Sequence, residues 1–485
     1  MSPVEALRRY RGICPDWSGF QAALGHPQPV SLRAHPERIH PAGLMQLLAD
    51  TGLQASPAEW DADSLRLGPD ASPGRHWGHF AGLFQVQEEA AQLPVRLLDP
   101  QPDERVLDLC AAPGNKTAQI ALAMANRGLV VANELQSGRL PAVRQLVRRL
   151  GLRNVLIHRG AGESLPGVTG PYDRVLVDAP CSGEGTWRKY RVQRRNAARR
   201  VDQSERDHLA ARQIRLLDRA VRLCRPGGRI VYSTCTYAPE ENEAVVDAVL
   251  RRHGDGLSVE TASVAGFPAS EGITEWAGQR FDPRLTGALR VWPGVTDTGG
   301  FFVVVLRRHG EPLDPADQPT GAASGDASRT LPAHPATDAV LRRFGIDAAD
   351  LRGLEAGPDG GRYLHFRVAG QWWPARPQPD AFGLAAIGLQ VKPVKPTTGL
   401  ALWLAPAATR NTVALDARQM AAFVQRQSVP LDDVKAALPL DGPGFVLVTH
   451  AGHGLGVARL NRQGRLESQF PKAWINPTPV FPVAG

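Results

Sequence analysis

The chain contains few cysteines, and their arrangement argues against two common structural uses of this residue. Five occur in 485 residues: Cys14, Cys110, Cys181, Cys224 and Cys235. An odd, widely spaced set is a poor disulfide framework. No CxxC pair is present, so a zinc site is not indicated and no metal is expected. The thiols are therefore expected to be reduced and available for chemistry.

Long hydrophobic runs are also missing. No stretch approaches the roughly 18 apolar residues of a membrane span, and the N-terminal segment MSPVEALRRYRG has no apolar signal core. We therefore expect a cytoplasmic, monomeric protein with no membrane partner. Acidic residues number 48 against 56 basic ones, giving a net charge of +8 and a pI near 9.5. This balance favours an anionic partner such as nucleic acid.

Composition and hydrophobic pattern divide the chain into four segments. Residues 1–75 show short helical patterns and are predicted to form a small N-terminal accessory domain. Residues 76–308 carry the strongest alternation of apolar strands and helices. Residues 309–335 are rich in Pro, Gly, Ala, Ser and Asp and are predicted to be a linker. Residues 336–485 contain short β-like runs such as YLHF and FVLVTH and are predicted to form the C-terminal region.

The second segment predicts an α/β fold. Buried strands are expected at 106–109, 129–134, 155–158, 174–180, 229–235 and 301–306, with helices at 117–125, between 134 and 150, and at 205–224. Strands that alternate with helices indicate a parallel sheet with right-handed crossovers.

A loop of small residues follows the first of these strands and predicts a cofactor site. Small residues let a ligand approach the backbone, and ligands of open α/β sheets bind outside the carboxyl ends of the strands. Glu134 ends the second strand, 20 residues after Gly114, a spacing suited to ribose hydroxyls. The pattern is not GxGxxG, which disfavours a dinucleotide. The loop comprises Cys110, Ala111, Ala112, Pro113, Gly114, Asn115 and Lys116.

Two cysteines follow neighbouring strands and should share the rim that holds this loop. Cys181 lies three residues after Asp178, and Cys235 ends the next strand. A thiolate that adds to C6 of a pyrimidine makes C5 nucleophilic, so such a cysteine suits methylation at C5. Asp178 is placed to bind the N3 and N4 edge of cytosine, and Lys116 to supply positive charge. Cys224, at the end of an apolar helix, is predicted to be buried instead.

Six ordered motifs resemble those of the RsmB/Nop/Sun family of RNA cytosine-5 methyltransferases. The motifs are FQVQEEAA (84–91), DLCAAPGNKT (108–117), ANE (132–134), DAPCSGEG (178–185), PGGRIVYSTCTYAPEENE (226–243) and TGGFF (298–302). The resemblance implies a Rossmann-like fold and S-adenosyl-L-methionine as cofactor, bound by residues 110–116, Glu134 and Asp178. It also implies that Cys235 is the nucleophile and that Cys181 assists product release. Arg139 stands where the family often has arginine, near the cofactor loop.

Three positions depart from the family pattern. Asn115 replaces a frequent glycine. His35 replaces an asparagine of the N-terminal motif, and the resemblance implies that the accessory domain of residues 1–75, which carries this motif, contacts RNA. Gly160 occupies the place of an aspartate that contacts the adenine. The adenine contact is therefore expected from the backbone or from Glu163.

Two further regions predict RNA binding. Residues 188–200 hold seven basic side chains and no acid, with Trp187 and Tyr190 beside them for base stacking. The C-terminal region resembles the tail of RsmF-type enzymes, which implies a PUA-like module and favours 16S rRNA, or the small ribosomal subunit, over tRNA. The alternatives are a tRNA cytosine-5 methyltransferase and a non-catalytic RNA-binding assembly factor.

Overall fold

A computed structural model describes residues 3–189, 202–310 and 334–475, apart from residues 360, 375, 392 and 435. Most of the predicted linker and most of the basic segment, including Tyr190, lie outside these ranges. Within them, no helix combines the length and apolar character needed to cross a membrane. The α-helices are α1 (Pro3–Leu7), α2 (Trp17–Leu24), α3 (Pro41–Ala49), α4 (Trp77–Phe80), α5 (Leu93–Leu98), α6 (Asn115–Ala123), α7 (Leu140–Leu150), α8 (Gln203–Leu223), α9 (Glu243–His253), α10 (Pro335–Phe344), α11 (Thr398–Leu404) and α12 (Ala417–Val424).

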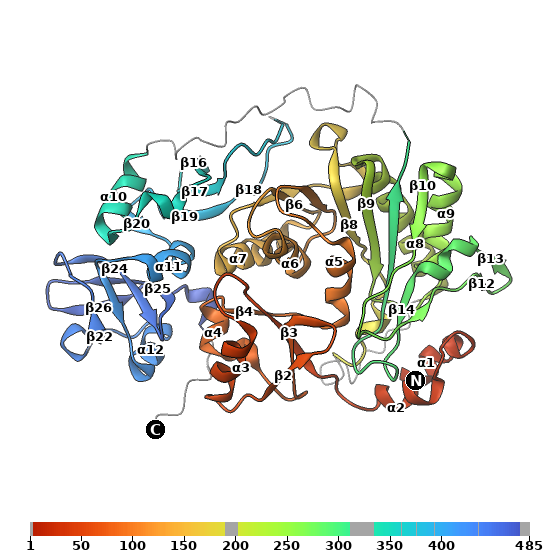
Figure 1. The fold of residues 1–485 in the computed structure, drawn as a ribbon, viewed down its shortest axis with the longest axis horizontal. Coiled ribbons are helices and arrows are strands. Elements are labelled where there is room, and N and C mark those ends of the chain that lie inside the picture. The colour runs from red at the N-terminus through yellow and green to blue at the C-terminus, as the bar shows by residue number, and fades with distance from the viewer. Residues whose placement is uncertain are drawn as a thin grey trace.

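A ten-stranded sheet forms the centre of the molecule (Figure 1). Its strands run in the order β11-β14-β15-β9-β8-β5-β6-β7-β18, and β10 also pairs with β15. The pairs β9-β8, β8-β5, β5-β6 and β6-β7 are parallel, as expected for a Rossmann-like domain. These strands are β5 (Arg105–Asp108), β6 (Leu129–Glu134), β7 (Val155–Arg159), β8 (Tyr172–Asp178), β9 (Cys224–Thr234), β10 (Leu257–Glu260), β11 (Ser270–Glu271), β14 (Leu289–Val291), β15 (Phe301–Arg308) and β18 (Ala381–Phe382).

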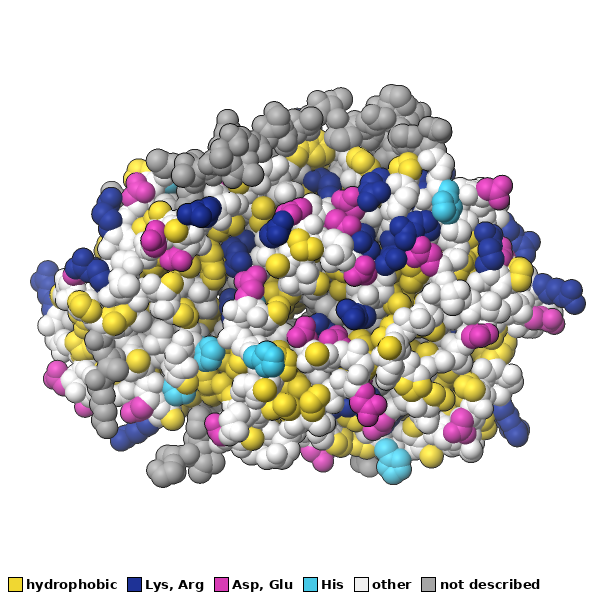
Figure 2. All heavy atoms as spheres, viewed as in Figure 1, with side chains coloured by type: hydrophobic (Ala, Val, Ile, Leu, Met, Phe, Trp, Pro, Cys, Tyr) yellow, Lys and Arg dark blue, Asp and Glu magenta, His cyan; other side chains and the backbone are white. Residues whose placement is uncertain are grey.

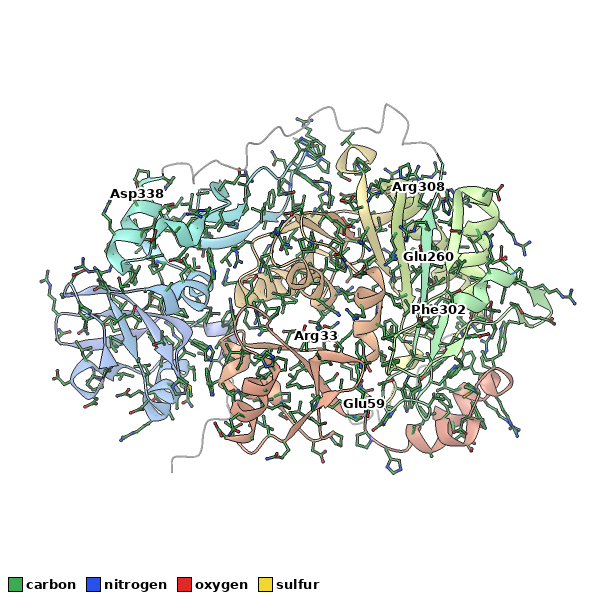
Figure 3. All side chains as sticks on the ribbon, viewed as in Figure 1. Arg33, Glu59, Glu260, Phe302, Arg308 and Asp338 are labelled. Carbon is green, nitrogen blue, oxygen red and sulfur yellow. The ribbon has the colours of Figure 1, made fainter. Side chains whose placement is uncertain are left out.

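The apolar runs of the parallel strands are explained by burial on both faces of the sheet. Val106 and Val130 face the layer of α5, α6 and α7, whereas Leu107 and Val131 face α8 and α9. Helix α7 covers its face with side chains at Val143, Leu146, Val147 and Leu150, the spacing of an amphipathic helix. On the other side of the centre, Phe302 (labelled in Figure 3) packs on Tyr232 of β9, with ring centroids 6.5 Å apart.

The predicted parallel strands and helices are confirmed, with small shifts at their ends. Strand β9 begins at Cys224, five residues before the predicted start at 229, and its pairing with β8 contains a bulge. Cys224 is fully buried, as predicted. The pairings on the two sides of the parallel strands were not predicted. On one side β15 pairs antiparallel with β9, and on the other side β18, which comes from the C-terminal region, pairs with β7.

The N-terminal region also contains a sheet that the helical patterns did not predict. Its strands run in the order β2-β3-β1-β4 and are β1 (Val30–Ala34), β2 (Ala55–Ala58), β3 (Asp61–Leu67) and β4 (Phe84–Val86). Strand β4 extends this sheet beyond residue 75. Arg33 of β1, labelled in Figure 3, pairs with Asp61 and donates to Gln92, directly before α5, at the side of this sheet that faces the ten-stranded sheet and its helices.

Two sheets make up the C-terminal region. The first contains β16 (Leu354–Asp359), β17 (Tyr363–Val368), β19 (Leu384–Gly388) and β20 (Lys395–Pro396). The second contains β21 (Thr412–Ala414), β22 (Val429–Pro430), β23 (Ala436–Ala437), β24 (Gly444–His450), β25 (His453–Leu460) and β26 (Arg465–Ser468). Two short hairpin strands, β12 (Glu275–Trp276) and β13 (Gln279–Arg280), lie at the opposite end of the molecule (Figure 1).

The N-terminal sheet and the second C-terminal sheet share one hydrophobic core, although they are far apart in sequence. Leu44, Trp77 and Phe80 pack in the same cluster as Phe423 and Phe470. The Trp77 ring meets the His450 ring edge-on with centroids 4.7 Å apart, and Phe80 meets Phe470 at 5.9 Å. The two regions therefore pack as one unit beside the ten-stranded sheet and its helices.

We expect Trp77→Ala to destabilise this unit by about 3–5 kcal/mol, the usual cost of removing a large buried aromatic side chain. Denaturant titration followed by intrinsic fluorescence and by proteolysis of the C-terminal region measures the effect. An unchanged unfolding midpoint would show that the shared core contributes little.

Candidate active site

The carboxyl ends of β5, β6, β8 and β9 meet at one rim and enclose a cavity of about 400 Å³. The predicted site residues line this cavity together, with the exception of Gly114. They are Cys110, Ala111, Ala112, Pro113, Asn115, Lys116, Glu134, Arg139, Asp178, Cys181 and Cys235. Parallel pairing thus assembles side chains that are up to 125 positions apart in the sequence, from Cys110 to Cys235.

Gly114 shapes the cofactor loop from behind. Its φ of 106° is a conformation that L side chains rarely adopt, and a Cβ there would lie 3.3 Å from the Cα of Val143 in α7. Glycine thereby allows the loop to lie close to the helix while Cys110 to Pro113 face the cavity.

Glu134 and Arg139 hold the other side of the loop. The Glu134 side chain is buried, and its carboxylate accepts hydrogen bonds from the backbone N–H of Ala112 (3.3 Å) and of Gln136 (2.8 Å). Arg139 donates to the carbonyl oxygen of Ala112 at 2.6 Å and lies 3.5 Å from the Glu134 carboxylate. Both side chains therefore brace the loop and reach the cavity.

Asp108, at the end of β5, has one carboxylate oxygen without a partner. Oδ2 accepts a hydrogen bond from Thr117 Oγ1 at 2.6 Å, whereas buried Oδ1 has no hydrogen-bond partner among the described residues. Burial raises the pKa of Asp108 to about 7, and the bond from Thr117 opposes only part of that effect. Burial likewise raises the pKa of the neighbouring Cys110 thiol, with Asp108 and Asp178 adding to the effect.

Lys116 and Asp178 form an ion pair on the cavity wall. Lys116 Nζ lies 2.7 Å from Asp178 Oδ2, and Ser233 Oγ donates to Oδ1 at 2.9 Å. Burial alone would lower the pKa of Lys116, but the Asp178 carboxylate outweighs it and the pKa is raised. The ammonium group therefore stays charged in a partly dry site.

The two rim cysteines, Cys181 and Cys235, lie side by side on the wall of the same cavity. Cys181 Sγ and Cys235 Sγ are 3.4 Å apart, and both thiols are free. The hydrogen bond to Cys235, together with burial, raises the pKa of Cys181 well above its ordinary value. Cys181 is therefore held as the thiol, and a thiolate at Cys235 would accept its hydrogen bond.

Several cavity residues were missed by sequence reasoning. Leu135, 46% exposed, follows Glu134 directly, and Gly162 lines the same side. Glu163, considered for the adenine contact, instead pairs with Arg212 at 2.6 Å, and it is Arg212 that lines the cavity. An apolar residue directly after the second-strand acid was the available signal for Leu135. The other missed lining residues include Gln28, Glu88, Gly300 and Phe301.

Asn115, one of the departures from the family pattern, connects the cofactor loop to the N-terminal sheet. Its Oδ1 accepts a hydrogen bond from Gln85 Nε2 at 2.8 Å, and Gln85 in turn accepts from Arg149. His35, which departs from the family pattern in the N-terminal motif, is buried and contacts the carbonyl oxygen of Leu150 at 3.0 Å. Both positions thus have structural partners in this chain.

Arg188, one of the two described basic residues of the segment, does not fit the predicted role in RNA binding, whereas Lys189 is exposed and lines the cavity. The Arg188 side chain is 2% exposed, pairs with Asp297 and donates to the carbonyl oxygens of Thr298 and Pro27. Trp187 packs partly buried against the cluster that contains Tyr10 and Trp292. The prediction was wrong for Arg188 because the polar carbonyl groups that surround it leave no open face for a phosphate. Residues 190–200 of the segment lie outside the described part of the chain.

Comparison with known proteins decides the family. Residues 95–307 match the model described as 16S rRNA methyltransferase RsmB/F, and residues 410–476 match the one described as methyltransferase RsmF PUA domain. The ribosomal RNA small subunit methyltransferase F of Aeromonas salmonicida is 31% identical over 477 residues, which cover 95% of this chain and 94% of that protein. The chain belongs to the RsmF family of methyltransferases.

Two further relatives match a shorter part of the chain. The Klebsiella pneumoniae methyltransferase F is 37% identical over 331 residues, a match that spans 65% of this chain and 65% of that relative's length. The 28S rRNA (cytosine-C(5))-methyltransferase of Mus musculus is 34% identical over 319 residues, or 64% of this chain and 39% of that protein.

A solved structure supports the fold. The methyltransferase homologue from Pyrococcus horikoshii superposes with a TM-score of 0.53 at 27% identity, covering 64% of this chain and all of that one. Together with the family models, it confirms the Rossmann-like domain and the C-terminal PUA module.

Family membership also confirms S-adenosyl-L-methionine as the expected cofactor, and the residues present fit it. Buried Glu134 suits ribose hydroxyls, the loop of small residues offers backbone groups, and the cavity of about 400 Å³ has room for the molecule beside the thiols. The unpartnered Asp108 Oδ1 adds an acceptor close to the loop.

Asp108 predicts a pH dependence of stability. Its pKa in the folded chain is about 7 and its ordinary value is 3.8, so its contribution to stability is present in acid and is lost as the pH rises towards 7. The variant Asp108→Asn lacks that loss, so its melting temperature relative to the parent chain should rise from pH 5, inside the window between 3.8 and about 7, to pH 8, above that window. A difference that stays constant or falls over this range would contradict the assignment.

Proposed function

We propose that this chain transfers a methyl group from S-adenosyl-L-methionine to C5 of cytosine in 16S rRNA. The observation that carries the proposal is the pair of thiols 3.4 Å apart on the wall of the cavity that also holds the cofactor loop and the Lys116–Asp178 pair. The relatives named above as small-subunit and cytosine-C(5) methyltransferases support the same reaction.

In the proposed mechanism Cys235 is the nucleophile. Its thiolate forms a bond to C6 of the cytosine, and the electron pair of the C5–C6 double bond shifts toward N3. Asp178 binds the N3 and N4 edge and favours protonation of N3, while Lys116 stabilises the charge that develops. The bound cofactor supplies the methyl group that ends on C5.

Cys181 acts in the second half of the reaction. After methylation, C5 still carries a proton, and a base must remove it before the bond between C6 and the Cys235 sulfur can break. Cys181, held as the thiol beside Cys235, can donate its proton to the departing Cys235 sulfur as it accepts the C5 proton, while the electron pair of the C6–S bond returns to the Cys235 sulfur. The products are 5-methylcytosine and the free enzyme thiols.

The RNA partner is supported by several features of the chain. The net charge is +8, and residues 410–476 match the RsmF PUA model. Lys and Arg side chains are interspersed with acidic ones over the face shown in Figure 2, so we expect binding to depend on shape as well as on charge. We propose that the chain acts as a monomer on ribosomal RNA in the cytoplasm.

The cysteine roles predict opposite behaviour of two variants. Cys235→Ala should abolish both methylation and the covalent protein–RNA adduct, whereas Cys181→Ala should trap a stable adduct because elimination stalls. Denaturing gel electrophoresis with labelled RNA measures the adduct. An adduct that survives in Cys235→Ala and disappears in Cys181→Ala would reverse the two roles.

Transfer of a labelled methyl group to fractionated cellular RNA tests the substrate. We expect label in 16S rRNA, recovered as 5-methylcytosine. Label confined to tRNA would favour the tRNA enzyme, and no label in naked RNA or in assembled subunits would favour the non-catalytic assembly factor.

A further inference from the structure

We propose that Glu241 and Asn242 are positioning residues that fix the two cysteine loops relative to each other, Glu241 acting on Cys181 and Asn242 acting on Cys235. The inference rests on the proposed function for the roles of the two thiols. Both side chains are fully buried, with 0% exposure, and neither lines the cavity. Glu241 and Asn242 therefore support the loops that carry the two thiols from the side away from the cavity.

Glu241 holds the backbone on both sides of Cys181. Its Oε2 accepts a hydrogen bond from the backbone N–H of Ser182 at 2.9 Å and another from Gln213 Nε2 at 3.0 Å. Gln213 Nε2 also donates to the carbonyl oxygen of Pro180 at 2.9 Å. The residues before and after Cys181 are therefore tied to one carboxylate.

Asn242 holds both sides of Cys235 in the same way. Its Oδ1 accepts a hydrogen bond from Thr234 Oγ1 at 2.6 Å, and its Nδ2 donates to the carbonyl oxygen of Thr236 at 3.1 Å. A single amide side chain thus supplies both a donor and an acceptor to the ends of this loop.

The two loops are also joined to each other and to the sheet. Ser182 Oγ and Thr236 Oγ1 are 2.7 Å apart, and the backbone N–H of Gly185 donates to the carbonyl oxygen of Cys235 at 2.9 Å. Tyr232 of β9 donates its hydroxyl hydrogen to the carbonyl oxygen of Glu241 at 2.5 Å. The Glu241–Asn242 pair is therefore itself fixed, directly before α9 begins at Glu243.

Because each side chain holds a different cysteine, their loss should affect different steps. Misplacing a reacting group by about 1 Å can cost on the order of 100-fold in rate. Without Glu241, Cys181 shifts and elimination slows. Without Asn242, Cys235 shifts and formation of the adduct slows.

Single-turnover kinetics separates these steps. Glu241→Ala should form the adduct at the parental rate but turn over roughly 100-fold more slowly, so the adduct accumulates. Asn242→Ala should slow adduct formation itself by a similar factor, with no accumulation. If both variants slow both steps equally, the pair has only a general structural role and the proposal is overturned.

The Cys181→Ala background sharpens the test. There, Glu241→Ala should leave the rate of adduct formation unchanged, because its effect passes through Cys181, whereas Asn242→Ala should still reduce it. An equal reduction by both substitutions would contradict the division of roles.

Three further variants control for folding. Glu241→Gln keeps an acceptor in a nearly identical shape, and burial already raises the pKa of Glu241, so this variant should restore turnover. Glu240→Ala removes a neighbouring carboxylate that contacts Arg9 and Trp276, away from the thiols, and should leave both steps unchanged. Gln213→Leu removes only the bond to Pro180 and one bond to Glu241, so it should reproduce the Glu241→Ala effect in weaker form even if that variant folds poorly.

A readout that needs no catalysis separates failure of this inference from failure of the proposed function. Diamide, an azo-dicarboxamide oxidant, takes two electrons and two protons from a neighbouring pair of thiols, which become a disulfide while the azo group becomes a hydrazine. In the parental protein, mass spectrometry should show rapid formation of the Cys181–Cys235 disulfide. In Glu241→Ala and in Asn242→Ala, this disulfide should form at least about tenfold more slowly. Parental rates in both variants overturn the positioning roles, whereas an adduct that persists in Cys235→Ala overturns the proposed function instead.

Discussion

The parallel pairing of β5, β6, β8 and β9 is the constraint on which the site depends. It brings the cofactor loop, Glu134, Asp178, Cys181 and Cys235 to one edge of the sheet, although they come from four separate segments. Burial on both faces holds these strands, because successive side chains such as Val106 and Leu107 enter different helical layers. A shift in strand register would displace the core side chains and the two thiols at once, and the thiols would then no longer lie beside the cofactor loop.

Burial and neighbouring charges then give the side chains at this edge of the sheet different protonation states. Burial favours the protonated form of Asp108, whereas Lys116 stays charged because Asp178 is adjacent. The thiol pair combines a hydrogen bond and burial to hold the proton on Cys181. Similar residue types in one cavity thereby obtain different protonation states, which acid–base and nucleophilic chemistry requires.

Much of the site could be predicted from the sequence, because its residues lie at the ends of strands with strong apolar patterns. The cofactor loop and both cysteines belong to this class. The N-terminal sheet could not be predicted in this way, because β2 and β4 are short and β2 includes Pro57. The same holds for the core that Trp77 shares with Phe470 and for the pairing of β18 with β7, since both depend on contacts between distant segments. Arg188 illustrates the limit for charge, because a basic side chain in a basic run is buried against carbonyl groups.

The central claim is that Cys235, rather than Cys181, forms the bond to the pyrimidine. Incubation with S-adenosyl-L-methionine and RNA that contains 5-fluorocytosine tests it most directly, because fluorine at C5 leaves no proton for the base to remove and the adduct persists. Peptide mapping of the trapped complex by mass spectrometry identifies the linked residue. The account predicts a methylated fluoropyrimidine attached to Cys235, and attachment to Cys181 would contradict it.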